Sequence, residues 1–531
     1  MSTSEPGPDN GGILLEEGQR FSSSVLWRLM KSYYADMGPR AWLTGEVPHY
    51  ITCNTYIAQS YAEVVLAYLH ELARTNKLVR DEPVYIIELA SGVGAFASYF
   101  LHKFGELHQE SSLRDVVVRY IMTDFTPNNL EAVSEHPHLR VFADKGLLGF
   151  GKFDIDTDEA IVLRGGHLLG ANSCKNPVIV LGNYAYDTFR QDIFRVEKGK
   201  LHEVLVTTRV PGESFTLSDL RTRYTQREID ESRYYDDALC NEMIAHYRAN
   251  LVDTTFTIPY YGLQATMRLF ALAGGRGMVL ASDKGFTHFD ELFQRHQQSL
   301  AFHGSFSMMV NFHALGEYFH RRGGVYESTS QRVLSLKTAM YLLGGSPDDF
   351  IDTRSAFRSR IEALGPGEYF ALQQRERPHE KTLAQILRLL KLSGYDPGLL
   401  YNCAAAIREQ CGGAPEWVVS ELRHAIDRAW SNFYMSSQNL PFELGRIYLA
   451  LGRPMEAARF TQLSIDWFGE IHPAYLNLGL AYYNAENPQL ALRAFHRAKE
   501  LKPESPIASE WIARIEAEQE RGIVTPTVAA T

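Results

Sequence analysis

Between residues 84 and 281 the chain alternates short apolar, β-prone runs with helical patterns, and this alternation constrains the fold more than any other feature. The runs lie at 84–88, 116–122, 177–181, 203–210 and 278–281. Strands that alternate with helices form a mostly parallel sheet through crossover connections. We therefore predict an α/β fold with a Rossmann-like sheet, preceded by helices over 24–31 and 56–71.

Beyond residue 382 the β-prone runs stop and the sequence has the pattern of successive helices. An internal repeat appears there at an offset of 34 residues, which is the tetratricopeptide period. The residues that recur are Leu444, Gly445, Tyr448 and Ala457 in the first copy and Leu478, Gly479, Tyr482 and Ala491 in the second. Small residues at such positions allow paired helices to approach closely. The pattern predicts an all-α, TPR-like domain.

These patterns divide the chain into a predicted domain layout. The α/β domain is expected over 21–350, with a charged, Tyr-rich helical insertion at about 211–255. A connector over 351–381 leads to the helical repeats, which extend from 382 to 520. The remaining ends, 1–20 and 521–531, are predicted to be disordered tails, because the first twelve and last ten residues are dominated by small and polar side chains.

Charge and cysteine content exclude several classes of function. The formal net charge of −10 gives no overall attraction to phosphate backbones or anionic lipid, so nucleic acid is a poor candidate partner. The 5 cysteines include no CxxC pair, so we expect no structural metal and a reducing compartment. No secretory signal and no run of about 18 apolar residues is visible. These features predict a cytoplasmic protein that does not bind a membrane.

A glycine-containing turn follows the first β-prone run. Glu88 ends that run, and Gly92 and Gly94 precede a helical pattern, which is where a ligand can approach the backbone closely. Asp124 ends the next run, where an acid can bind the hydroxyls of a ribose. The acid at Glu88, and Ala97 in place of a third glycine, favour S-adenosylmethionine over a dinucleotide. The alternatives are a turn that serves packing alone and an Asp124 that only caps a helix.

A third group of polar residues follows the run at 177–181. Asn183 could orient a methyl acceptor, and Asp187 could hold or deprotonate it. Tyr184 or Tyr186 could face the sulfonium through its π cloud. The alternative is that Asp187 caps a helix and the tyrosines belong to the core.

The order of these segments resembles the MidA-like methyltransferases, a family that includes a mitochondrial complex I assembly factor that methylates a protein arginine. The resemblance covers roughly 24–344, and the segments that carry it are 50–52, 88–94, 183–187, 283–285, His296 and 304–312. It implies S-adenosyl-L-methionine as cofactor and a class I methyltransferase sheet. The cofactor-binding residues that we predict are Thr52, Glu88, Ala90, Gly92, Gly94 and Asp124. The predicted substrate-binding residues are Glu46, Tyr186, Asp283 and His296, and the predicted catalytic residues are Asn183, Tyr184 and Asp187.

The chain departs from this family at three acids. Tyr184, Ser305 and Asn311 stand where the family has carboxylates. A guanidinium keeps its proton at any ordinary pH and needs carboxylates to pair with it. Arginine is therefore one candidate acceptor, and an amide, a hydroxyl or another amine is the other.

Two functions remain after this comparison. The first is a methyltransferase acting on a nitrogen of a protein, a peptide or an amino-acid-like natural-product precursor. The second is a catalytically weak scaffold or assembly factor that works through its repeats, which are expected to bind a protein partner or to mediate homodimerisation. A nicotinamide dehydrogenase is disfavoured by Glu88 and by the absence of a second catalytic constellation.

Overall fold

The computed structural model describes residues 12–45, 47, 50–293, 295–296, 300–333, 336–375 and 378–521. The chain divides into two compact units, Met1–Ala371 and Leu372–Thr531. None of the helices in these described ranges is long and apolar enough to cross a membrane.

The first unit is built on a mixed sheet that has ten strands among the described residues. Its order is β16-β17-β12-β7-β2-β3-β4-β5-β6, with β15 paired to β12. The strands are β2 (Val84–Glu88), β3 (Val118–Asp124), β4 (Leu148–Lys152), β5 (Ile161–Leu163), β6 (Leu168–Leu169), β7 (Val178–Asn183), β12 (Gly277–Phe286), β15 (Val310–Asn311), β16 (Val325–Ser328) and β17 (Leu336–Leu343). Neighbours from β4 to β12 are parallel, whereas β17 is antiparallel to both β12 and β16. The structure thus confirms four of the five predicted runs as strands of one α/β sheet.

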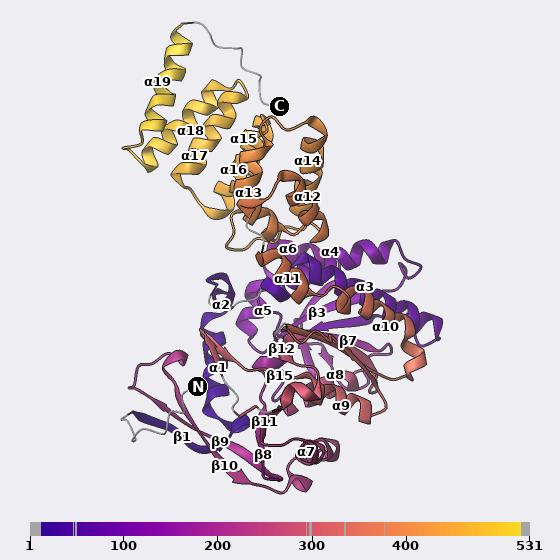
Figure 1. The fold of residues 1–531 in the computed structure, drawn as a ribbon. Coiled ribbons are helices and arrows are strands. Elements are labelled where there is room, and N and C mark those ends of the chain that lie inside the picture. Colours follow the sequence, from indigo (N-terminus) through magenta and orange to yellow (C-terminus); the bar gives the residue numbers. More distant parts are fainter. Residues whose placement is uncertain are drawn as a thin grey trace. The chain divides into compact units, whose positions relative to one another are not determined.

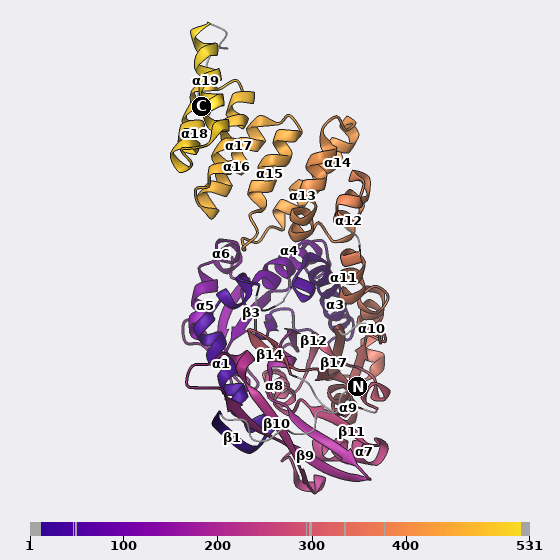
Figure 2. The ribbon, with the colours of Figure 1, turned by 60° about the vertical axis from the view of Figure 1, so that its left-hand side comes forward.

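Helices cover both faces of this sheet, which explains why its central strands are apolar throughout. Helices α3 and α4 lie on one face, and α8 and α9 lie on the other (Figures 1 and 2). Residues 178–181 of β7 are fully buried. The α-helices of this unit are α1 (Val25–Met37), α2 (Arg40–Leu43), α3 (Thr55–Arg74), α4 (Ala95–Gln109), α5 (Pro127–Ser134), α6 (Pro137–Asp144), α7 (Ala238–Asn250), α8 (Tyr260–Ala271), α9 (Phe312–Arg321), α10 (Ile351–Phe357) and α11 (Pro366–Arg375).

The strand order places a topological switch point between β2 and β7. From β2 the chain proceeds to β3 and β4 on one side, then returns to β7 on the other side. In open α/β sheets a crevice forms outside the carboxyl ends of the strands at such a point. The ends of β2, β3 and β7 are therefore where a ligand site is expected.

A second, antiparallel sheet corrects three sequence predictions. Its strands are β1 (Ile13–Arg20), β8 (Asp192–Glu197), β9 (Lys200–Val210), β10 (Arg221–Glu228) and β11 (Thr254–Ile258). The predicted tail at 1–20 is wrong over β1, the run at 203–210 does not belong to the main sheet, and the insertion at 211–255 is only partly helical. Residues 1–11 and 522–531 of the predicted tails lie outside the described residues.

The physical reason is that these strands differ in burial: β11 is buried along its whole length, β9 buries alternate side chains over 204–210, and β1 has no buried residue. The buried side chains of β9 include Val204 and Val206, and the side chains that alternate with them over 204–210 are half-buried. In β10 the pairing with β9 outweighs a charged composition that resembles a surface helix. Glu16 of β1 also holds α1, because the Ser24 hydroxyl and the Val25 N–H both donate to its carboxylate, at 2.5 and 2.7 Å.

The predicted connector at 351–381 is not a linker at its start. Glu71 of α3 is 1% exposed and accepts hydrogen bonds from the main-chain N–H groups of Asp352 and Thr353, at 2.9 and 3.0 Å. These are first-turn donors of α10, which have no partner within the helix itself. Helix α10 is therefore part of the first unit, whose boundary lies near Ala371 rather than near residue 350.

The second unit is helical in the range that the structure describes. Its α-helices are α12 (Leu383–Leu392), α13 (Pro397–Cys411), α14 (Glu416–Ser431), α15 (Leu440–Ala450), α16 (Pro454–Phe468), α17 (His472–Asn484), α18 (Pro488–Leu501) and α19 (Pro506–Glu520). Gly445 of α15 faces Thr461 of α16, and Gly479 of α17 faces the Phe495 ring of α18, each too closely for a Cβ atom. The two glycines thus occupy equivalent positions in successive helix pairs. Membership of the tetratricopeptide class stays a prediction.

Candidate functional site

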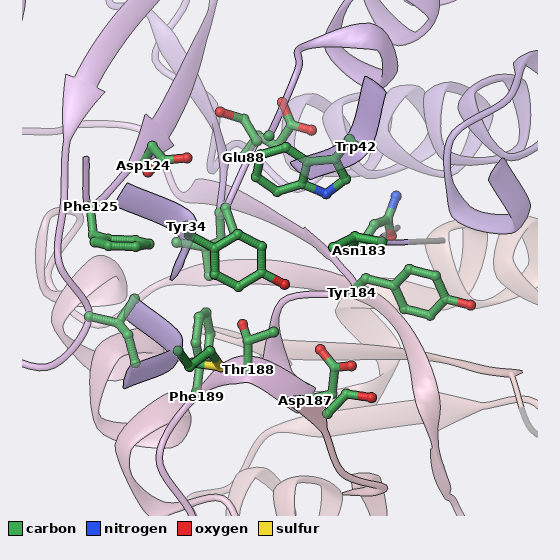
Figure 3. Close-up of a pocket in the computed structure, with 18 of the residues that line it drawn as sticks. Tyr34, Trp42, Glu88, Asp124, Phe125, Asn183, Tyr184, Asp187, Thr188 and Phe189 are labelled. Atoms are coloured by element: carbon green, nitrogen blue, oxygen red, sulfur yellow. The ribbon is translucent and has the colours of Figure 1, made fainter. Parts of the chain in front are cut away.

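A pocket lies at the carboxyl ends of β2, β3 and β7 (Figure 3). In that view Glu88 and Asp124 lie on one side of Tyr34, and Asp187 lies on the other. The predicted site residues that line it are Thr52, Glu88, Ala90, Gly92, Asp124, Asn183, Tyr184 and Asp187. The structure therefore brings the three sequence motifs into one cavity.

Glu88 has the chemistry of a ligand-binding carboxyl. It ends β2, is 5% exposed, and its Oε2 atom has no hydrogen-bond partner among the described residues. Burial raises the pKa of Glu88 to about 8, and the nearby Tyr120 hydroxyl offsets that rise only in part. A buried carboxyl without a partner is costly unless a ligand supplies one. A cationic group entering the pocket would satisfy it.

The turn after Glu88 has an unusual backbone. Ala90, Gly92 and Gly94 all have positive φ values, of 50°, 54° and 81°. Gly94 is the N-cap of α4 and does not line the pocket, whereas a Cβ atom on Gly92 would lie 3.4 Å from the Trp42 ring. Ala90 lacks the freedom of glycine, and such strained residues concentrate at functional sites. The turn opens the backbone to a ligand at the positive end of α4.

Asp124 matches both of the interpretations offered from sequence. Its Oδ1 atom accepts hydrogen bonds from the N–H and hydroxyl of Thr126, at 2.8 and 2.7 Å, which is a local capping arrangement. Asn129 donates to Oδ2 at 2.8 Å. The carboxylate nevertheless lines the pocket, and Oδ2, which accepts the one bond from Asn129, has a further lone pair. Burial raises the pKa of Asp124 against the effect of these hydrogen bonds.

The side chain of Asn183 forms hydrogen bonds with two neighbouring segments of the protein. The Tyr61 hydroxyl donates to its Oδ1 atom at 2.9 Å, and its Nδ2 atom donates to the Thr52 carbonyl at 3.2 Å. The amide thus fastens the loop that carries Thr52 to the end of β7. These contacts position the loop, and the acceptor-orienting role of Asn183, which also lines the pocket, stays a prediction.

Asp187 and Asp283 form a buried carboxyl pair. The main-chain N–H of Asp187 donates to Asp283 Oδ2 at 3.0 Å, and the two side chains interact directly. Asp187 lines the pocket, and its buried Oδ1 atom has no hydrogen-bond partner among the described residues, whereas Asp283 does not line the pocket. Burial raises the pKa of Asp187 to about 7. Burial and the charge of Asp187 raise the pKa of Asp283 further.

The remaining predicted substrate residues are distributed unevenly. Tyr184 lines the pocket with φ 48°, and burial raises its pKa, so the phenol stays protonated. Tyr186 is a core residue, 1% exposed, whose hydroxyl forms a hydrogen bond with that of Thr266. His296 is exposed and outside the pocket lining. Glu46 lies outside the described residues.

Sequence reasoning missed the wall that α1 and α2 contribute. Tyr34 and Trp42 stack with ring centroids 5.4 Å apart and line the pocket. On the same wall Lys31 lies 2.5 Å from an Asp156 oxygen, which also faces Arg190 at 3.0 Å. Asp156 follows β4, so the rule that polar residues gather after parallel strands could have identified it. Trp42 is part of a turn-rich segment that carries no recognisable motif.

Comparisons with known proteins leave the function to be argued from this pocket. No family model matches the chain, and no curated protein matches it. A solved COG1565 superfamily member from Burkholderia thailandensis, bound to S-adenosyl-homocysteine, is 14% identical with a TM-score of 0.41. A native structure of a COG1565 superfamily protein from the same organism is 14% identical with a TM-score of 0.38. Each match covers 63% of this chain and 90% of the other, and at these scores neither supports a functional conclusion.

Proposed function

We propose that the chain is an S-adenosylmethionine-dependent methyltransferase of the MidA-like type. The observation that carries this proposal is Glu88, whose unpartnered oxygen lies in one pocket with Asp124 and the turn at Gly92. When bound there, the cofactor supplies an electrophilic methyl group on a sulfonium. Glu88 would pair with its cationic amino group, and Asp124 would accept hydrogen bonds from its ribose hydroxyls.

The sheet order weighs against a nicotinamide dehydrogenase. From β4 to β12 it follows the classic order 3-2-1-4-5 of doubly wound folds. The antiparallel β17 then intervenes between β12 and β16, where the dinucleotide-binding order continues with its sixth strand. No group of three or more His, Cys, Asp or Glu side chains within the described residues is placed to hold a metal ion.

Calorimetry with S-adenosylhomocysteine tests the proposal directly. Saturable binding by the full chain, lost in an Asp124→Asn and Glu88→Gln double variant, is the expected result. Absence of binding would overturn the proposal and favour the scaffold alternative. Incubation with radiolabelled S-adenosylmethionine and a cell lysate then separates a macromolecular acceptor from a small-molecule one.

At pH values just below the pKa of Glu88, binding of S-adenosylhomocysteine is expected to release a proton from this carboxyl. The free carboxyl is largely protonated there, because its pKa is raised to about 8. Pairing with the ligand's cationic amino group lowers that pKa, so affinity should rise with pH and level off above about 8. Calorimetry in two buffers of different ionisation enthalpy measures the release. Glu88→Gln should abolish it, and equal proton release in that variant would contradict the assignment.

Asp187→Asn is expected to reduce kcat/KM for the methyl acceptor more than Tyr184→Phe does. If the acceptor is a guanidinium, loss of one charge-assisted hydrogen bond corresponds to about 10- to 100-fold in kcat/KM. A neutral phenol makes no such bond, so Tyr184→Phe should have a smaller effect. Both variants are measured with arginine, an arginine peptide and the acceptor found in lysate. Full activity in both would show that this segment does not line the acceptor side.

We further propose that the helical unit recognises a protein substrate or partner. A chain that ends at Ala371 keeps α10 and its contacts with Glu71, so it is expected to fold and to bind S-adenosylhomocysteine. It should no longer methylate a macromolecular acceptor, or it should associate in solution with a different number of subunits from the full chain. Turnover of that acceptor and a number of subunits in solution that both equal those of the full chain would contradict the recognition role.

A further inference from the structure

Building on the proposed methyltransferase activity, we propose that Asp187 is the base that removes a proton from a neutral N–H or O–H acceptor. A guanidinium is then not the group that is methylated. The proposal rests on the buried pair of Asp187 with Asp283, on the place of Asp187 in the pocket lining, and on its oxygen that has no hydrogen-bond partner among the described residues.

The geometry leaves one atom of the pair available to a substrate. Asp187 lines the cavity and is 7% exposed, and its buried Oδ1 atom has no hydrogen-bond partner among the described residues. Its main-chain N–H donates to Asp283 Oδ2 at 3.0 Å, which holds the short helix at Tyr186–Thr188 against the end of β12. Asp283 is fully buried and receives the Lys284 N–H on its other oxygen at 2.8 Å. It therefore supports Asp187 and does not reach the pocket.

Two carboxyls in contact and out of water cannot both be ionised, so the pair shares one proton and carries about one negative charge. The groups that face it from other elements are few. They are Lys284 of β12, Tyr184 after β7, Tyr34 of α1 and Tyr61 of α3. Within the part of the chain that the structure describes, no arginine is among them, and the lysine is exposed. Asp283 is fully buried and outside the pocket lining, so we assign the shared proton to it and leave Asp187, which lines the pocket, as the basic member.

This arrangement suits a neutral acceptor better than a guanidinium. Arginine recognition uses ionised carboxylates in bidentate pairs, and here half of the available charge is cancelled by the shared proton. Ser307 on β14 (Ser305–Ser307), together with Tyr184, adds a neutral hydroxyl to the pocket lining. A base near neutral pKa is the group that assists loss of a proton from an amide, amine or hydroxyl.

The step that follows is balanced. The lone pair of the acceptor nitrogen or oxygen attacks the methyl carbon, and the new bond forms as the carbon–sulfur bond breaks with its electrons going to sulfur. The acceptor's proton moves to Asp187 Oδ1. The pair ends with two protons and no charge, and S-adenosylhomocysteine leaves as a neutral thioether.

Infrared spectroscopy of the full chain saturated with S-adenosylhomocysteine tests the shared proton without a known acceptor. A protonated-carboxyl band should persist at neutral pH and disappear in Asp283→Asn. Glu88→Gln is the matched control, because it identifies any contribution from that other buried carboxyl. Absence of a band that depends on Asp187 and Asp283 would overturn the inference, whereas loss of ligand binding would overturn the proposed function instead.

The labelled lysate acceptor tests the substrate class. Asp187→Asn should bind S-adenosylhomocysteine like the parent while its kcat/KM falls about 100- to 10,000-fold, which is the usual contribution of a general base. The parent's kcat/KM should rise with pH through about 7 and that of the variant should not. Label recovered as methylarginine would refute the inference and leave the methyltransferase proposal standing. Label recovered on an amide, a neutral amine or a hydroxyl would support it.

Discussion

Gly94→Val should weaken binding of S-adenosylhomocysteine about 5- to 150-fold. Gly94 begins α4 with φ 81°, a conformation that a β-branched residue avoids. Valine would relax the turn, and rebuilding it around a ligand costs about 1–3 kcal/mol. That cost converts to the stated loss of affinity at about 1.4 kcal/mol per decade. Isothermal titration calorimetry measures it.

Gly105→Val is the matched control for this prediction. It places the same side chain on the same helix, at a glycine where an added Cβ atom meets nothing within 4 Å. Its affinity for S-adenosylhomocysteine should equal that of the parent. Equal affinities in both variants would show that the turn after β2 does not hold the ligand.

Glu71→Ala should lower the free energy of unfolding of the first unit by about 2–4 kcal/mol. The variant leaves hydrogen-bond donors without an acceptor, and a buried donor costs about 1–3 kcal/mol when it is unsatisfied. Those donors are the N–H groups of Asp352 and Thr353, together with the Thr353 hydroxyl. Urea unfolding followed by circular dichroism measures the change. Glu71→Gln keeps one acceptor oxygen and should lose about half as much. An Ala variant as stable as the parent would mean that α10 is not anchored through this carboxylate.

The main sheet could be predicted because its central strands are buried on both faces. Continuous apolar runs such as 84–88 and 177–181 are the signature of that burial, and an acid or amide follows each. Glu88, Asp124 and Asp187 meet in the pocket because the ends of parallel strands share one edge. The cofactor side of the site thus follows from local pattern and topology together.

The second sheet and the pocket's outer wall could not be predicted in the same way. The charged strand β10 is a strand because it pairs with β9, and no local pattern in 221–228 requires that. The position of Trp42 over Gly92 depends on how α1 and α2 pack, which is a tertiary result. Tyr186 shows the opposite error, since its place in a motif suggested a substrate contact and its ring fills the core.

The attachment of α1 through Glu16 has a consequence for the order in which the site is made. The Thr208 hydroxyl also donates to that carboxylate at 2.7 Å, across a sequence separation of 192 residues. Contacts of such high contact order form late, because the intervening chain must first be brought together. During synthesis the wall that carries Lys31 and Tyr34 cannot close until β9 has left the ribosome. A nascent chain that already contains Glu88 and Asp124 would therefore still hold an open crevice.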